Sequence, residues 1–226
     1  MRNYYAHKLS DCRLKQVYDL APPRVRQYLQ AELHYALDRI NAGDHVLDLG
    51  CGYGRTFFQL CRQAGFVTGI DTSAGNLEMG REFLQGISNY LLIRMNANKL
   101  LFPAESFDIV LCLQNGISAF HINRKVLVRE AIRVIRYGGL VLFSTYAEKF
   151  WNDRLEWFRI QSGAGLLGRI IPEKTGHGTI VCDDGFTAYT LNSLDFILLT
   201  EYIPDITVNM EEVYESSLFC VIKKIS

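Results

Sequence analysis

Two kinds of apolar pattern follow each other along the chain and predict strands and helices in alternation. Short apolar runs of strand type occupy residues 46–49, 66–71, 90–95, 108–113 and 140–145. Between them, apolar residues recur at the spacing of one helix face, over residues 57–64, 74–85 and 122–136. Strands that alternate with helices predict an α/β fold with a mostly parallel sheet.

The segments on either side of this core carry patterns of their own. Before it, two helical patterns at residues 9–20 and 25–40 are separated by Pro22 and Pro23, which break a helix. After it, a helix is predicted at residues 148–161, with Trp151, Leu155 and Phe158 facing inward. The remaining chain predicts a hairpin of residues 178–182 and 186–191, a short helix from residue 192, and two strands at residues 205–210 and 218–225.

Charge and composition narrow the classes of protein to consider. The 226 residues contain 24 Lys and Arg and 24 Asp and Glu, so the formal net charge is zero and we expect no nucleic-acid partner. The N-terminal residues form no apolar signal core and no apolar run is long enough to span a bilayer, which predicts a cytoplasmic protein with no membrane partner. The six cysteines form no C-x-x-C pair and the histidines lack ligand spacing, so no metal site is predicted.

The chemistry of the chain is predicted to centre on residues 46–55, Val-Leu-Asp-Leu-Gly-Cys-Gly-Tyr-Gly-Arg. A strand, a tight glycine turn and a helix are expected here, and the glycines let a ligand lie against the backbone at a helix N-terminus. The dinucleotide pattern G-x-G-x-x-G fails because Arg55 stands at its last position. Asp48 would also repel a pyrophosphate, whereas its carboxylate suits a ligand that carries ammonium and sulfonium charges.

Three stretches resemble motifs of the class I S-adenosylmethionine (SAM)-dependent methyltransferases. Residues 46–55 resemble motif I, in which an apolar strand with an Asp precedes Gly-x-Gly-x-Gly. Residues 96–113 resemble the pattern Asp-Ala-x-x-Leu-Pro-Phe followed by Phe-Asp and a strand, with Asn96 in place of Asp and Leu101 in place of Pro. Residues 133–142 resemble the family's Arg-Val-Leu-Lys-Pro-Gly-Gly stretch, with Tyr137 in place of Pro.

This resemblance implies a Rossmann-like, seven-stranded mixed sheet with an antiparallel last strand, flanked by helices, and SAM as the cofactor. We therefore expect residues 1–226 to form a single domain. Within it we expect an N-terminal helical cap (1–40), a cofactor-binding core (41–146), a substrate lid that includes the hairpin after strand five (147–192), and a closing helix and hairpin (193–226). For the cap and the lid, the alternative is that these segments only pack on the sheet or form a solvated hairpin.

The resemblance also implies the residues that contact SAM. Asp71 ends the second strand, where a carboxylate binds both ribose hydroxyls; capping the next helix is the alternative, although Ser73 or Thr72 also suits that role. Asn96 and Ala97 can offer an oxygen and a backbone N–H to adenine. The predicted cofactor-binding residues are Asp48, Gly50, Cys51, Gly52, Gly54, Arg55, Asp71, Thr72, Asn96, Ala97 and Leu113.

The loop after the fourth strand is expected to face the transferred methyl group, because ligands of open α/β sheets bind at the carboxyl ends of strands. It lacks Asn/Asp-Pro-Pro-Tyr, which disfavours methylation of base or glutamine amino groups, and it locally resembles the loop of glycine N-methyltransferase-like enzymes. We predict that Tyr5, Asn115, His121 and Tyr146 form the catalytic pocket. His121 is a candidate base because its ordinary pKa lies near neutrality, and a structural role is the alternative.

The predicted function is methyl transfer from SAM to an N, O or S atom of a small molecule, by a monomer or a homodimer. A thiol or arsenic methyltransferase that uses Cys112 and Cys182 is one alternative. A nucleic-acid or protein methyltransferase and a non-catalytic SAM-binding regulator are the others.

Overall fold

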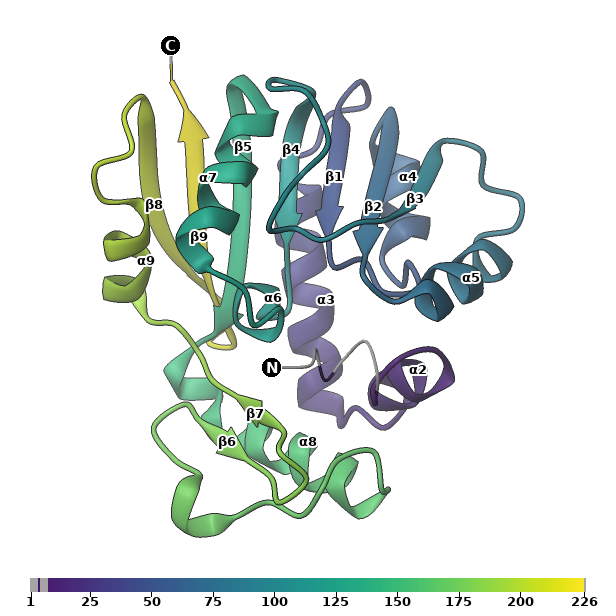
Figure 1. The fold of residues 1–226 in the computed structure, drawn as a ribbon, viewed down its shortest axis with the longest axis vertical. Helices are drawn as coiled ribbons and strands as arrows, with labels where there is room; N and C mark the ends of the chain where they lie inside the picture. The colour runs from purple at the N-terminus through teal and green to yellow at the C-terminus, as the bar shows by residue number, and fades with distance from the viewer. Residues whose placement is uncertain (1–3, 5–7, 226) are drawn as a thin grey trace.

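The computed structural model describes Tyr4 and residues 8–225, and a seven-stranded sheet forms its centre (Figure 1). The strand order is β3-β2-β1-β4-β5-β9-β8. Strands β1 to β5 are parallel, β9 runs antiparallel to β5, and β8 runs antiparallel to β9. The strands are β1 (His45–Leu49), β2 (Phe66–Asp71), β3 (Tyr90–Arg94), β4 (Phe107–Cys112), β5 (Ile135–Tyr146), β8 (Ile206–Val213) and β9 (Ser217–Lys224). The predicted mixed sheet with an antiparallel last strand is confirmed.

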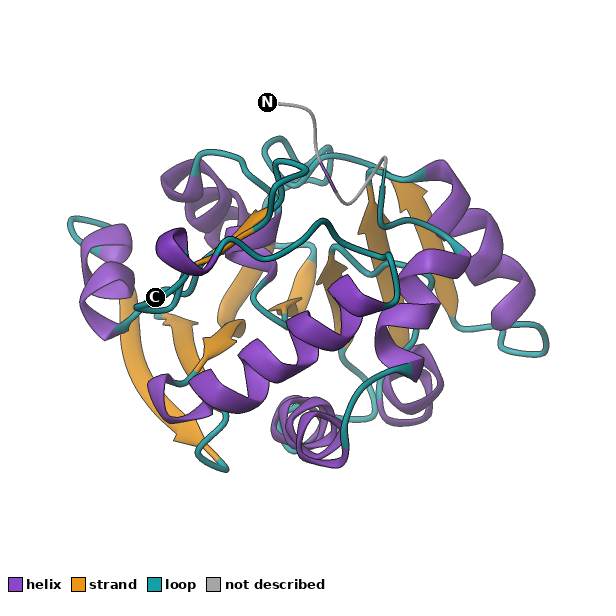
Figure 2. Cartoon of the chain, turned by 90° about the horizontal axis from the view of Figure 1, so that it is seen from below, coloured by secondary structure: helices purple, strands orange, loops and turns teal. Residues whose placement is uncertain are grey.

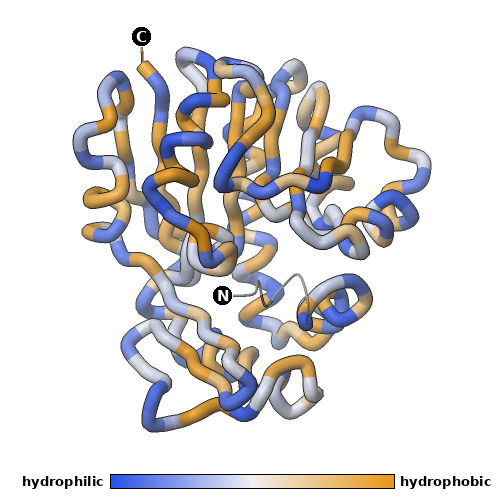
Figure 3. The backbone as a smooth tube through the Cα atoms, viewed as in Figure 1, coloured by the Kyte–Doolittle hydropathy of each residue, from blue (hydrophilic) through white to orange (hydrophobic). Residues whose placement is uncertain are grey.

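Helices cover both faces of this sheet, as the view from below shows (Figure 2). Side chains alternate between the two faces along a strand. Ile109 and Leu111 of β4 therefore pack with α3 (Pro23–Leu37), α4 (Phe57–Gln63) and α5 (Ala74–Phe83). Val110 and Cys112 pack on the other face with α7 (Arg124–Val134) and α9 (Ser193–Thr200). Because both faces are covered, the central strands are apolar along most of their length (Figure 3).

A third apolar cluster lies beyond the carboxyl ends of the parallel strands and joins three distant parts of the chain. It contains Val17 of α2 (Cys12–Asp19), Trp157 and Phe158 of α8 (Trp151–Gly163), and Phe186 beside the hairpin of β6 (Ile180–Val181) and β7 (Thr187–Ala188). The short helix η1 (Glu148–Phe150) leads from β5 into α8, and η2 (Pro172–Lys174) lies between α8 and β6. Through this cluster α2, α8 and the hairpin pack together, and Figure 1 shows them below the sheet.

Strand β5 begins earlier than its apolar run predicts. Ile135 already pairs with Phe107, and the register then shifts before Ile109 pairs with Leu140. Two glycines permit this irregularity within the strand. Gly138 has φ of 80°, and a Cβ on Gly139 would lie 2.6 Å from the backbone oxygen of Asp108. Residues 135–139, at the end of the predicted helix and before the predicted strand, are therefore an irregular start of β5.

Two helices also differ from the prediction. The short helix α6 (Gly116–Ala119) was not expected from the sequence. In α8, the face predicted to point inward is displaced, because Trp151 and Leu155 are only partly buried. The buried residues of α8 are Arg154, Trp157, Phe158 and Gln161. Nothing in the apolar spacing indicates that an arginine and a glutamine occupy the buried face.

Within the described residues, no helix combines the length and the apolar character that a bilayer crossing requires.

Candidate active site

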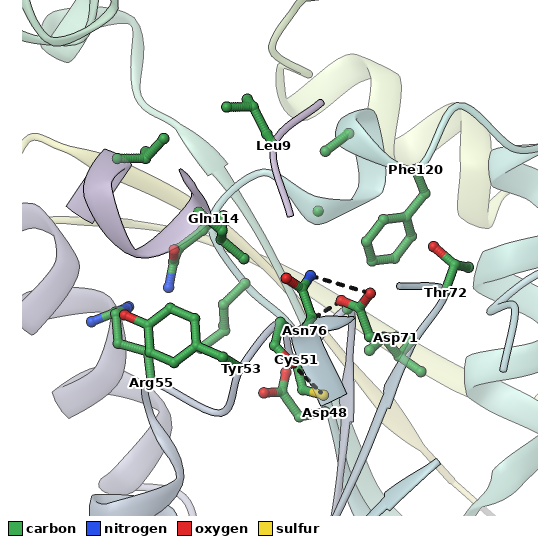
Figure 4. A pocket seen from close by; sticks show the side chains of 18 of the residues that line it. Leu9, Asp48, Cys51, Tyr53, Arg55, Asp71, Thr72, Asn76, Gln114 and Phe120 are labelled. Atoms are coloured by element: carbon green, nitrogen blue, oxygen red, sulfur yellow. Dashed lines mark hydrogen bonds between the residues drawn. The ribbon is translucent and has the colours of Figure 1, made fainter. Parts of the chain in front are cut away.

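A cavity opens at the carboxyl ends of β1, β2 and β4, where the strand order reverses. Strand β1 pairs with β2 on one side and with β4 on the other, which is the switch point at which open α/β sheets bind ligands. Figure 4 shows Arg55 and Gln114 on one side of this cavity and Thr72 and Phe120 on the other. Residues of α2 and α8 complete its wall.

The glycine turn after β1 forms the floor of the cavity. The amides of Gly50 and Cys51 both donate to the carbonyl of Ile70, which fixes the turn against the end of β2. Gly50 has φ of 75°, and a Cβ there would lie 2.5 Å from the ring of Phe120. Gly52 has φ of 57° and lies close to the side chain of Leu14 from α2. These two positions require glycine both for the backbone conformation and for the close packing.

Asp71 connects the end of β2 to this turn. Its Oδ2 accepts the Gly52 amide at 3.0 Å, and its Oδ1 accepts the Ser73 amide at 2.7 Å. The N-cap of α5 is Ser73, whose side chain accepts the Asn76 amide. Burial raises the pKa of the Asp71 carboxyl, and hydrogen bonds from the Ser73 and Gly52 amides oppose this. The carboxylate lines the cavity beside the glycine backbone.

Asp48 and Arg55 bring opposite charges to the same wall. Burial raises the pKa of the Asp48 carboxyl to about 7, an effect that Arg55 opposes and Asp71 reinforces. The Arg55 guanidinium lies 4.7 Å from the centre of the Tyr18 ring. Its Nε and Nη2 are buried and have no hydrogen-bond partner among the described residues. Because buried N–H groups are normally satisfied, these donors suit an anionic or carbonyl group of a ligand.

The buried carboxyl of Glu32 lies behind the part of the cavity wall that Gln114 forms. Glu32 of α3 is fully buried, and its Oε2 accepts the amide of Gln114 at 3.1 Å. Gln114 and Asn115 follow β4 with φ of 54° and 61°, a left-handed conformation that costs free energy in residues other than glycine. The side chain of Gln114 accepts the Tyr18 hydroxyl at 2.8 Å. Glu32 therefore holds the turn that joins β4 to the cavity wall.

The structure brings most of the predicted cofactor residues to this cavity. It is lined by Asp48, Gly50, Cys51, Gly52, Arg55, Asp71, Thr72, Asn96, Ala97 and Leu113, and by Tyr146 from the predicted catalytic set. Gly54 does not line it; a Cβ there would lie 2.9 Å from Leu84, so this glycine serves packing. The Oδ1 of Asn96 already accepts the Asn98 amide, so it has one fewer lone pair to offer adenine. Tyr5 lies outside the described residues.

Asn115 and His121 are not found among the described residues that line the cavity. The Asn115 amide is used within the protein, because Nδ2 donates to the Tyr189 carbonyl at 2.9 Å and Oδ1 accepts the Thr145 hydroxyl at 2.8 Å. The His121 ring lies 6.4 Å from the ring of Tyr189, and burial and Arg124 lower its pKa. The left-handed turn after β4 directs the Asn115 side chain toward Thr145 of β5 and the Tyr189 carbonyl just after β7. The catalytic role of Asn115 and His121 stays a prediction.

Other residues of the site were not predicted. The burial of Glu32 could have been predicted, since Glu32 lies on the helical stripe that contains Leu29 and Ala36. For Gln114, its place after a strand was the one indication in the sequence that it belongs to the site. Trp157 and Gln161 line the cavity from α8, and only the tertiary packing of that helix places them there.

Comparison with known proteins agrees with the geometry. Residues 46–139 match the model of a methyltransferase domain family. The chain is 30% identical over 166 residues to the ubiquinone biosynthesis O-methyltransferase of Pseudomonas fluorescens, covering 71% of this chain and 65% of that protein. It is 29% identical over 143 residues to the 2-methyl-6-phytyl-1,4-hydroquinone methyltransferase of a Synechocystis species, covering 59% of this chain and 42% of that protein. The chain thus spans less than two thirds of the length of these relatives.

A solved SAM-dependent methyltransferase from Aquifex aeolicus has the same fold, with a TM-score of 0.62 and 15% identity over 92% of this chain and 96% of that one. The sheet and the matched region define a class I methyltransferase fold. Residues 46–139 are therefore assigned to a methyltransferase domain of this class, whose cofactor is SAM.

Proposed function

We propose that this protein binds SAM in the cavity and transfers its methyl group to a small molecule. The observation that carries the proposal is the division of the cavity wall. Asp48, Arg55 and Asp71 bring charge on the side of β1 and β2, whereas the α8 residues that line the cavity are uncharged and mostly aromatic. A cationic nucleoside fits the charged part, and a methyl acceptor shielded from water fits the other.

Three side chains match the groups of SAM. Asp71 offers carboxylate oxygens for the ribose hydroxyls, beside the glycine backbone that it already contacts. Asp48 supplies negative charge for an ammonium, and the unpartnered N–H groups of Arg55 suit the carboxylate of the methionine portion. When bound, SAM supplies an electrophilic methyl group on its sulfonium. The protein residues therefore need to bind and align the two reactants.

The cap and α8 exclude water from the reaction. Leu14 of α2 packs on Gly52, and the Trp157 indole donates to the Val17 carbonyl at 3.0 Å. These contacts join α2 to the glycine turn and to α8 across the cavity. Holding two reactants in line can contribute on the order of 7–11 kcal/mol to the lowering of a barrier. This alignment is the main catalytic contribution that we assign to the chain.

The thiol or arsenic alternative is disfavoured by the state of the cysteines. Neither Cys112 nor Cys182 is among the described residues that line the cavity. Burial raises the pKa of the Cys112 thiol well above its ordinary value, and raises that of Cys182 to about 11. Both side chains are therefore thiols near neutral pH, not the thiolates that act as nucleophiles or metal ligands.

The names of the relatives support a small-molecule acceptor. One is named for methylation of a phytyl hydroquinone and the other for an O-methylation in ubiquinone biosynthesis. Both names refer to hydroquinone or quinone compounds, not to a protein or a nucleic acid.

Transfer of a labelled methyl group tests the proposal. The protein is incubated with methyl-labelled SAM and a panel of phenols, amines and thiols, and both labelled product and S-adenosylhomocysteine are measured. We expect label in at least one small molecule, with an equal amount of S-adenosylhomocysteine. Asp71→Asn should reduce the transfer, and Asp38→Asn, at an exposed position at the end of α3, should not. Cofactor binding with no transfer to any acceptor would contradict the proposal and favour a SAM-binding regulator.

A further inference from the structure

The part of the cavity formed by α8 has a composition that restricts the molecules it can hold. Within the described part of the chain, the charged residues that line the cavity are Asp48, Arg55 and Asp71, all from β1, its glycine turn and β2. The cavity is also lined by the aromatic wall of Tyr146, Trp157 and Phe158, none more than 8% exposed. The buried Arg154 guanidinium lies 4.6 Å from the centre of the Tyr146 ring and 5.4 Å from that of Phe158, but Arg154 is not among the described residues that line the cavity. An ionised group placed against this wall would therefore lose its hydration without a charged side chain to contact directly.

Most polar atoms of the aromatic wall already have a partner in the protein. The Trp157 indole N–H donates to the Val17 carbonyl. The Tyr18 ring of α2 lies beside this wall, 6.4 Å from the Trp157 ring, and its hydroxyl donates to Gln114. Tyr146 also has an interaction within the protein. These rings therefore present mainly their flat apolar surfaces to the cavity.

Gln161 is the exception on this wall. It lies on α8 one turn beyond Trp157 and Phe158, lines the cavity and is 2% exposed. Its backbone carbonyl accepts the Leu166 amide, but its side-chain amide makes no hydrogen bond within the described residues. A neutral amide buried at a cavity surface needs a donor or acceptor from whatever occupies the cavity.

We infer that Gln161 is the specificity-determining residue for the methyl acceptor, and that the acceptor is an uncharged planar ring with a hydroxyl or carbonyl group at its edge. The inference rests on the proposed function. The rings of Trp157 and Phe158 contact the faces of such a molecule, and the Gln161 amide hydrogen-bonds its polar edge. The amide both donates and accepts, so a hydroxyl and a carbonyl both satisfy it.

Binding of hydroxyarenes to the Trp151→Phe variant tests this assignment without requiring turnover. This variant keeps Trp157, in the cavity wall, as the single tryptophan of the chain. Catechol, hydroquinone and methylhydroquinone are titrated in the presence of saturating S-adenosylhomocysteine, and tryptophan fluorescence is recorded. Benzylamine and phenylacetate are the charged counterparts. We expect the uncharged rings to change the fluorescence at concentrations at least tenfold lower than the charged ones.

The role of Gln161 is tested in the same titration and in a turnover assay. Gln161→Leu should weaken hydroxyarene binding and raise the acceptor KM at least tenfold, with the affinity for S-adenosylhomocysteine unchanged. Gln161→Asn should recover part of the loss, and Gln30→Leu, at an exposed position on α3, should behave as wild type. An unchanged acceptor KM in Gln161→Leu, preferred binding of a charged ring, or no binding of any hydroxyarene would each overturn the inference. Heat of S-adenosylhomocysteine binding is measured separately, and its absence would instead refute the proposed function.

Discussion

Replacement of Glu32 by Gln tests how burial controls the proton affinity of the carboxyl behind the site. Oε1 of Glu32 accepts the Ser217 hydroxyl at 3.2 Å, and Oε2 accepts the Gln114 amide at 3.1 Å. A glutamine has the same shape and preserves both contacts, because its oxygen can accept the Gln114 amide while its NH2 donates to the Ser217 oxygen. Glu32→Gln therefore removes the titration and leaves the packing in place.

The expected magnitude follows from the pKa of Glu32. Burial raises it from 4.5 to about 7, against the opposing effect of hydrogen bonds such as that from Ser144. Between these pH values the folded protein holds the proton more tightly than the unfolded chain, so the Glu32 contribution to stability falls as pH rises, and it is constant above pH 7. Since one pKa unit corresponds to about 1.4 kcal/mol, the loss between pH 5 and pH 8 is about 2–3 kcal/mol.

Urea unfolding of wild type and Glu32→Gln at pH 5 and pH 8 measures this loss. The free energy of unfolding of the variant, minus that of wild type, should increase by about 2–3 kcal/mol between the two pH values. Glu78→Gln, at an exposed position on α5, is the control, and its difference from wild type should change little with pH. A Glu32→Gln difference that is constant with pH, or that decreases toward pH 8, would refute the reasoning.

Two further predictions concern the floor of the cavity. Gly50→Ala should destabilise the protein by about 1–3 kcal/mol and weaken SAM binding, because φ of Gly50 is positive and the new Cβ would clash with the Phe120 ring. Thermal unfolding measures the loss of stability, and Gly43→Ala, where a Cβ would meet no atom within 4 Å, is the control. SAM binding at pH 6 should release close to one proton, because the cation favours the ionised form of Asp48, whose pKa burial raises to about 7. Calorimetry in buffers of different ionisation enthalpy measures this release, and proton uptake, or equal release in Asp48→Asn, would contradict the assignment.

The core of the fold could be predicted from the sequence because its signals are local. The strand predicted at residues 66–71 has the same bounds as β2, since an apolar run between turn residues needs no distant partner to be recognised. The prediction failed where distant residues decide the conformation. Strand β5 begins at Ile135 because Phe107 is available to pair with it, and the inward face of α8 is set by α2 and the hairpin.

The residues of the candidate site also fall into those that a local pattern predicts and those that depend on distant contacts. The glycine turn and Asp71 were predicted because their chemistry lies within one short segment and one strand end. Asn115 was predicted from its position in a loop, but its side-chain direction depends on a left-handed turn and on Thr145 and Tyr189, which no local pattern reveals. Gln161 was missed because an isolated polar residue on a helix is normally exposed to solvent.

Titration calorimetry with SAM and with S-adenosylhomocysteine tests the central claim most directly, because the claim is that the turn after β1 binds a cationic sulfur nucleoside. Wild type is predicted to bind both ligands at one site per chain. Asp71→Asn should weaken both by about ten- to a hundredfold, since a hydrogen bond to a charged group contributes about 1.5–3 kcal/mol, while Asp38→Asn should bind as wild type. No heat with either ligand, or equal affinity in Asp71→Asn and wild type, would contradict the account.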